Sequence, residues 1–273
     1  MDVDASSSIC APVPALGTVL CAIDASPSAK AVLYAAAGLA AGGSRLVVLR
    51  VDDEKEAAEI ALTELALQTV PGWLAYRQET ELIARGGQPA RTILSVAAEQ
   101  DATLIVMGTH SRGGLARLVR GSVAASVLVD TTIPVAVVPP SGPELFALTE
   151  DRAVPHAGSV LVPIDLDGEW DRQLAFASTL AAASRCDVTL LHVIPPRADS
   201  MAPLRRLQAI AAHARARSDV HVVVTHGPLV RVIADRQARA GAGVIVLGRD
   251  AASPGHVARE LLETARAVVV FVP

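Results

Sequence analysis

The residues most able to do chemistry lie in a glycine-rich segment at positions 106–123, with the sequence VMGTHSRGGLARLVRGSV. Apolar residues that indicate a strand end at Gly108, and Gly121-Ser122 stands directly before an apolar run that indicates a helix. Glycines let a ligand approach the backbone closely, and the free N–H groups at a helix start attract negative charge. The segment therefore predicts a loop that binds phosphate.

Asp24 is another candidate for ligand binding, because it directly follows an apolar run at 18–23. In an open parallel sheet, ligands bind beyond the carboxyl ends of the strands, where the strand order reverses. Asp24 is therefore expected to share a crevice with the loop, although an aspartate at a strand end can equally cap the following helix. A Walker A loop is excluded because the chain has no Gly-Lys pair.

Short apolar runs alternate with helical stretches, which predicts a parallel sheet covered by helices on both faces. Ser26 as the N-cap and Pro27 as the first helical residue are expected to begin the first helix, which Gly42-Gly43 would end. In the first half, strands are expected at 18–23, 46–51, 79–84, 103–107 and 134–138, and further helices at 53–68, 89–100 and 122–129.

The same order of elements recurs with a period of about 140 residues, since Asp165 repeats Asp24 and Gly248 repeats Gly108. This period indicates a tandem domain, because solenoid repeats are about 20–50 residues long. The predicted division is a first repeat at 1–141, a linker at 142–157 and a second repeat at 158–273. Strands of the second repeat are expected at 160–164, 188–193, 220–225, 244–247 and 268–272.

Together, the first strand, Asp24 and the glycine-rich segment resemble the universal stress proteins, over both halves of the chain. The nucleotide-binding pattern of that family is Gly, two residues, Gly, nine residues, Gly and then Ser or Thr. Here Gly108, Ser111, Gly121 and Ser122 occupy these positions, so Ser111 in place of the second glycine is the one departure. The resemblance implies that the first repeat binds ATP, with Mg²⁺ or Mn²⁺ held through the phosphates.

The resemblance also implies roles for twelve residues. An exposed loop histidine is the alternative for His110, and a simple N-cap is the alternative for Ser122. The residues expected at the adenosine are Ala22, Ile23, Asp24 and Val51; those at the ribose and phosphates are Met107, Gly108, His110 and Ser111; and those that would hold the phosphates at the helix start are Gly121, Ser122, Val123 and Ala124.

For the fold, the resemblance implies the α/β class, with two tandem Rossmann-like, doubly wound domains. Each would hold a five-stranded parallel sheet of order 3-2-1-4-5. In the family the fifth strands pair across a two-fold axis, so 134–138 and 268–272 are expected to pair antiparallel within one chain. This pseudo-dimer would cover two apolar strand edges, and a homodimer is a further expected assembly.

The second repeat departs from the family pattern. Ala251 stands at the position of the second glycine, and Leu261 and Leu262 occupy the Gly-Ser positions. The chain from Gly248 onward is also six residues shorter than the corresponding part of the first repeat. Branched side chains are expected where phosphate oxygens need backbone amides, which predicts one nucleotide per chain.

The composition excludes several other classes of protein. The 273 residues are 51% hydrophobic and carry a net charge of −4, unlike a basic nucleic-acid binder. No apolar run is long enough to cross a bilayer, and no basic residue precedes Lys30, so neither a membrane span nor a signal peptide is expected. Cys10, Cys21 and Cys186 have no metal-binding spacing, and we expect inert core cysteines in a cytoplasmic protein.

Three functions stay open on the sequence. The leading hypothesis is a stress-response protein that binds an adenine nucleotide and acts through its conformation or its partners. A slow ATP hydrolase or phosphotransfer enzyme is the second, but only Asp24 and His110 could serve as a general base, so turnover should be far below the roughly 1–100 s⁻¹ of kinases. The third is a dimerisation module with a vestigial pocket, which Ser111 favours.

Overall fold

The first repeat folds as a five-stranded parallel sheet with helices on both faces. A computed structural model describes residues 16–40, 43–69, 80–109, 122–139, 145–148, 153–155, 158–214, 219–248 and 256–273. The strands are β1 (Thr18–Ile23), β2 (Arg45–Asp52), β3 (Thr80–Gly86), β4 (Ala102–Gly108) and β5 (Val135–Val138). The helices are α1 (Ala29–Ala40) and α2 (Lys55–Thr69) on one face, and α3 (Pro89–Glu99) and α4 (Val123–Asp130) on the other.

The second repeat folds in the same way. Its strands are β8 (Ser159–Pro163), β9 (Asp187–Ile194), β10 (Val220–His226), β11 (Ala242–Gly248) and β12 (Val268–Val272). Its helices are α5 (Asp171–Ser184) and α6 (Met201–Ala214) on one face, and α7 (Leu229–Ala240) and α8 (His256–Thr264) on the other. Two apolar layers therefore form the core, one on each face of the sheet.

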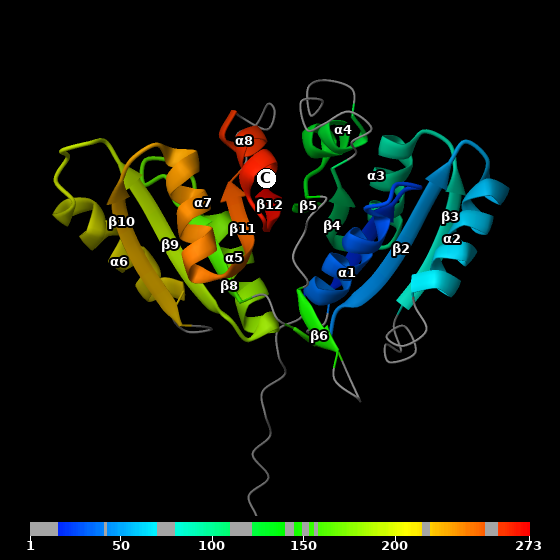
Figure 1. The fold of residues 1–273 in the computed structure, drawn as a ribbon, viewed down its shortest axis with the longest axis horizontal. Helices are drawn as coiled ribbons and strands as arrows, with labels where there is room; N and C mark the ends of the chain where they lie inside the picture. The colour runs from blue at the N-terminus through cyan, green and yellow to red at the C-terminus, as the bar shows by residue number, and fades with distance from the viewer. Residues whose placement is uncertain are drawn as a thin grey trace, which may run out of the picture.

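All ten strands form one continuous sheet of order β10-β9-β8-β11-β12-β5-β4-β1-β2-β3 (Figure 1). Each half has the predicted order 3-2-1-4-5, so the predicted tandem α/β fold is confirmed. The two halves meet at the centre of the sheet, where β5 and β12 pair antiparallel with Ala136 opposite Val270. Both strands are fully buried, as the Val-rich sequences of central strands require.

The start of α1 differs from the prediction. Asp24 Oδ1 accepts a hydrogen bond of 2.8 Å from the N–H of Ser26, and the Ser26 carbonyl accepts one of 3.1 Å from the N–H of Ala29. These bonds form a turn, so Ser26 and Pro27 precede the helix. The first helical bond runs from the N–H of Val32 to the carbonyl of Ser28. Asp24 therefore shapes the loop that leads into α1, and the helix begins at Ala29, two residues later than predicted.

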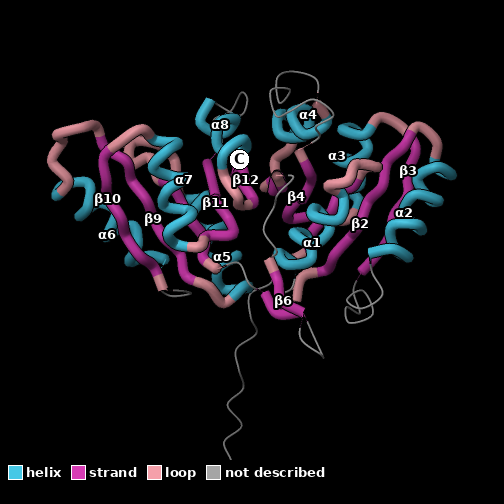
Figure 2. Tube along the Cα trace, viewed as in Figure 1, coloured by secondary structure: helices cyan, strands magenta, loops and turns pink. Residues whose placement is uncertain are grey.

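The predicted linker contains an antiparallel strand pair, β6 (Phe146–Leu148) and β7 (Ala153–Pro155), which the sequence reading missed. The pair packs beside α1, as Figure 2 shows for β6. Leu145 is buried against the same helix, and a Cβ atom at Gly38 would lie only 2.5 Å from the Leu145 Cβ. Gly38 thus allows the chain between the repeats to pack closely on the first repeat.

Two of the three cysteines lie within the described residues, and both are free. Cys21 is fully buried in β1, and its burial raises the pKa of its thiol far above the ordinary value. Burial and the charge of Asp187 raise the pKa of Cys186 to about 11. Cys10 lies outside the described residues.

We expect both thiols to react slowly in the folded protein. An ordinary thiol of pKa 9.0 is about 10% thiolate at pH 8, whereas one of pKa 11 is about 0.1%, and the thiolate is the reactive form. In a Cys10→Ser variant, a thiol reagent at pH 8 should therefore label the native protein about 100-fold more slowly than the unfolded chain. Equal rates would contradict this account of the two thiols.

Within the described ranges, no helix is both long enough and apolar enough to cross a membrane.

Candidate functional site

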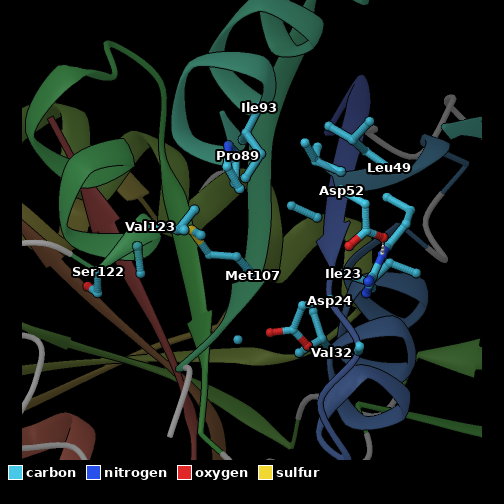
Figure 3. Close-up of a pocket in the computed structure, with 16 residues that line it drawn as sticks. Ile23, Asp24, Val32, Leu49, Asp52, Pro89, Ile93, Met107, Ser122 and Val123 are labelled. Carbon is cyan, nitrogen blue, oxygen red and sulfur yellow. Dashed lines mark hydrogen bonds and ion pairs between the residues drawn. The ribbon is translucent and has the colours of Figure 1, made fainter. Parts of the chain in front are cut away.

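A cavity of about 480 Å³ lies at the carboxyl ends of β1, β2 and β4 (Figure 3). These strands flank the point where the sheet order reverses, because β2 follows β1 on one side and β4 lies on the other. The last residues of all three strands, the two residues after β1, and residues near the starts of α3 and α4 supply most of its wall. The cavity thus occupies the position at which doubly wound sheets bind ligands.

Nine of the twelve predicted site residues line this cavity. They come from four separate parts of the first repeat, and the fold brings them together. The nine are Ala22, Ile23, Asp24, Val51, Met107, Gly108, Ser122, Val123 and Ala124. The other three, His110, Ser111 and Gly121, lie outside the described residues, so their predicted roles stay predictions.

Sequence reasoning missed several lining residues. These are Ala25, Val32, Leu49, Arg50, Asp52, Pro89 and Ile93. Most are apolar and carry no signal of their own, since only the packing of α1 and α3 against the sheet reveals which of them reach the cavity. Arg50 did carry a signal, because it is the one charged residue inside the apolar run LVVLRV.

The start of α4 presents backbone N–H groups to the cavity. Ser122 is the N-cap, and its hydroxyl oxygen accepts a hydrogen bond of 3.1 Å from the N–H of Ala125. The first helical bond joins the N–H of Ser126 to the Ser122 carbonyl, so the N–H groups of Val123 and Ala124 have no partner in the helix. The Ser122 hydroxyl still has a proton to donate, so its capping role is compatible with ligand binding.

Asp24 lies at the end of β1 beside the cavity, where Figure 3 shows it below Met107. Its bond to the N–H of Ser26 recurs in the second repeat, where Asp165 Oδ1 accepts from the N–H of Asp167 at 3.0 Å. A carboxylate at this strand end is therefore a structural feature of both repeats. Only Asp24, however, is placed by the structure in the wall of this cavity.

Gly108 ends β4 at a point where α1 comes very close. A Cβ atom here would lie 2.9 Å from Cγ2 of Val32, which itself lines the cavity. Any larger residue would have to displace Val32 or enter the cavity. The glycine is therefore required by close helix packing as well as by access to the backbone.

Arg50 and Asp52 form an ion pair at the end of β2, with 2.6 Å between Nε and Oδ2. The Arg50 side chain is 7% exposed and that of Asp52 is 31% exposed. The described wall thus carries two carboxylates, Asp24 and Asp52, and one guanidinium. Within the part of the chain that the structure describes, no three His, Cys, Asp or Glu side chains gather into a metal-binding cluster.

The second repeat is built differently at the corresponding point. Its central strands β8 and β11 pair only as far as Leu161 and Ile245, whereas β1 and β4 pair up to Ala22 and Met107. Pro163, the counterpart of Ala22, has no N–H to contribute to the ladder. The two central strands therefore lose their backbone pairing near their carboxyl ends.

A side chain from α5 fills this gap. Gln173 is 4% exposed, and its amide donates to the carbonyls of Pro163 and Val246, both at 2.8 Å. Its counterpart in the first repeat is Val32, which is apolar and leaves the crevice open. Nearby, Arg206 donates to the Leu166 carbonyl at 2.7 Å and so ties α6 across the loop after β8.

One detail of the prediction for the second repeat is wrong. Leu261 and Leu262 do not stand at a helix start, because α8 already begins at His256. Both leucines lie in the second half of this helix, with their side chains buried in the core. The shorter segment after β11 moves the helix start toward the N-terminus relative to the family spacing. The difference between the repeats therefore rests on Gln173, Pro163 and the shorter segment rather than on the two leucines.

Comparison with known proteins gives a family and a fold. The universal stress protein family matches residues 16–139 and 157–273, while no curated protein matches the sequence. A universal stress protein from Archaeoglobus fulgidus DSM 4304 has a TM-score of 0.64 and 19% identity, covering 94% of this chain and 96% of that chain. A candidate universal stress protein from Pseudomonas aeruginosa UCBPP-PA14 has a TM-score of 0.60 and 17% identity, covering 93% and 92%.

A shorter match is the universal stress protein from Archaeoglobus fulgidus in complex with dAMP. It covers 42% of this chain and 97% of that chain, with 21% identity and a TM-score of 0.37.

Proposed function

Because the chain belongs to the universal stress protein family, we propose that its first repeat binds an adenine nucleotide, with ATP as the expected ligand. The observation that supports this proposal is the cavity, whose wall holds nine of the twelve residues that the sequence singled out. Its volume of about 480 Å³ falls within the roughly 300–1,000 Å³ of small-molecule sites. The bound nucleotide would regulate the conformation or the partners of a cytoplasmic stress-response protein.

The wall suggests how the nucleotide would lie. Phosphates would bind at the start of α4, where the N–H groups of Val123 and Ala124 and the Ser122 hydroxyl can donate. Asp24 would accept from a ribose hydroxyl, and the apolar side chains of Met107 and Ile93 would pack against the nucleoside. Mg²⁺ or Mn²⁺ would be held through the phosphates.

The pairing of β5 with β12 bears on assembly. It uses the edges of both fifth strands inside one chain, which supports an intramolecular pseudo-dimer. A homodimer of the whole chain would then have to form through another surface, such as the outer edges of the sheet at β3 and β10. Adenine nucleotide binding does not require that second interface, because the described wall comes from the first repeat alone.

The two strand-end aspartates provide a matched test of the proposal. Asn can still accept the bond from the following N–H, so Asp24→Asn and Asp165→Asn should both fold. Loss of a hydrogen bond to a charged group costs about 1.5–3 kcal/mol, so Asp24→Asn should weaken ATP binding by about tenfold or more, whereas Asp165→Asn should not. Equilibrium binding of a fluorescent ATP analogue, displaced by ATP, measures both; equal effects of the two changes, or no binding to the wild type, would refute the proposal.

A further inference from the structure

The ion pair at the end of β2 is the least explained part of the cavity wall. Arg50 stands in an otherwise apolar strand and is only 6% exposed, yet it lines the cavity together with Asp52. A partly buried ion pair adds little net stability, because removing its charges from water offsets much of their attraction. The need to hold the sheet together therefore does not account for it.

The second repeat supports this view because it does without the pair. The counterparts of Arg50 and Asp52 on β9 are His192 and Ile194, so no ion pair forms there. His192 Nδ1 instead lies 2.8 Å from the carbonyl of Ile164. The same strand end can thus be built without charges of opposite sign, and the pair occurs in the repeat whose crevice is open.

The position of the pair within the cavity identifies the part of a ligand that it would meet. Across the sheet the order is β5-β4-β1-β2, and Figure 3 shows Val123, at the start of α4, beside Met107 of β4. A nucleotide with its phosphates at Ser122 and its ribose at Asp24 would reach β2 with its base. Figure 3 shows Asp52 on the wall beside Leu49 and Ile23, across from Val123 and Ser122.

The hydrogen-bonding groups of the pair are suited to such a base. Arg50 uses Nε for Asp52, and among the described residues its two terminal amino groups make no other hydrogen bond. A guanidinium carries five N–H donors, so the terminal amino groups of Arg50 keep donors that the ion pair does not use. Asp52 contributes carboxylate oxygens, which only accept. A donor and an acceptor thus stand side by side on the cavity wall.

We propose that Arg50 and Asp52 read the base of the bound nucleotide and select a purine that carries an amino group at position 6. Arg50 would donate to a ring nitrogen, and Asp52 would accept from the neighbouring amino group, as the edges of adenine allow. A 6-oxo purine places a carbonyl oxygen where the amino group would be, opposite the Asp52 carboxylate. This inference rests on the proposed function and adds to it the residues that choose the base.

The test compares adenosine, inosine and ATP by calorimetric titration of the full chain and three variants. The wild type should bind adenosine about tenfold or more tightly than inosine, because a polar site rejects a ligand that leaves its groups unpaired. In Asp52→Asn, the amide can both accept and donate, so this ratio should fall toward one. Arg50→Gln should weaken adenosine and ATP by the same factor of about tenfold, since both ligands carry the same base.

The matched control is His192→Ala, which should leave all three affinities unchanged, and thermal unfolding checks that each variant is folded. An unchanged preference for adenosine in Asp52→Asn would overturn the inference, as would an Arg50→Gln protein that loses affinity for ATP but not for adenosine. Failure of the wild type to bind either ligand would instead overturn the proposed function, and this inference with it.

Discussion

Gly108→Leu should abolish nucleotide binding, with an affinity for ATP at least about 100-fold below that of the wild type. The Cβ atom alone would lie 2.9 Å from Cγ2 of Val32, and the rest of the leucine has to enter the cavity or push Val32 into it. A 100-fold loss corresponds to about 2.7 kcal/mol, which is the loss of one or two hydrogen bonds to a charged phosphate. Equilibrium titration with ATP measures the effect.

The second repeat offers a matched control at the same strand position. A Cβ atom at Gly248 would lie 3.3 Å from Oε1 of Gln173, in a crevice that this side chain already fills. Gly248→Leu should therefore leave ATP affinity within about twofold of the wild type, since surface changes away from a site are nearly neutral. If the two variants lose affinity equally, or if Gly108→Leu still binds as the wild type does, the cavity is not the nucleotide site.

Gly158→Ala should have the largest effect on stability. Gly158 precedes β8 with φ at +65°, and a Cβ atom there would lie 2.1 Å from the carbonyl oxygen of Gly241. The left-handed conformation costs a non-glycine residue about 1–2 kcal/mol, and relief of the backbone clash costs about 1–3 kcal/mol more. Urea unfolding followed by circular dichroism should show the second repeat destabilised by about 2–5 kcal/mol.

Gly17 is the counterpart of Gly158 in the first repeat and provides the comparison. Its φ is +78°, but the nearest atoms to an added Cβ belong to the Thr103 side chain at 3.1 Å, so this side chain would have to shift by only a few tenths of an ångström. Gly17→Ala should therefore cost only the conformational part, about 1–2 kcal/mol. Equal losses of unfolding free energy in the two variants would show that the backbone clash at Gly241 is not decisive.

The inner strands were predictable because their apolar runs are buried on both faces, and all the runs repeat after about 140 residues. Thr18–Ile23 and Val268–Val272 have the predicted limits, and the two fifth strands pair as expected. The start of α1 was not predictable from Ser26 and Pro27, because the bond between the Asp24 carboxylate and the Ser26 N–H forms a turn first. Local helix-starting signals were outweighed by a side-chain bond from the preceding strand end.

The candidate site was predictable where the chemistry is carried by a motif, as at Gly108 and Ser122. It was not predictable where a residue enters through packing between elements, as Val32 does, or where a neighbouring strand sets the position, as for Asp52. The Gln173 side chain that fills the crevice of the second repeat was not predictable from the sequence for the same reason. A glutamine inside a helix has no distinctive signal, and only the separation of β8 from β11 beside Pro163 gives Gln173 its two carbonyl partners.

The central claim is that only the first repeat binds a nucleotide, because its crevice is open, whereas Gln173, Pro163 and the shorter segment after β11 together leave the second repeat without a nucleotide site. Isothermal titration calorimetry of the full chain with ATP tests this claim most directly, because the stoichiometry counts the sites. We predict one ATP per chain for the wild type and also for Gln173→Val. This variant removes the side chain that fills the second crevice, but the segment after β11 stays too short to form a phosphate-binding loop. Two equivalent sites in the wild type, or no heat of binding at all, would contradict the account.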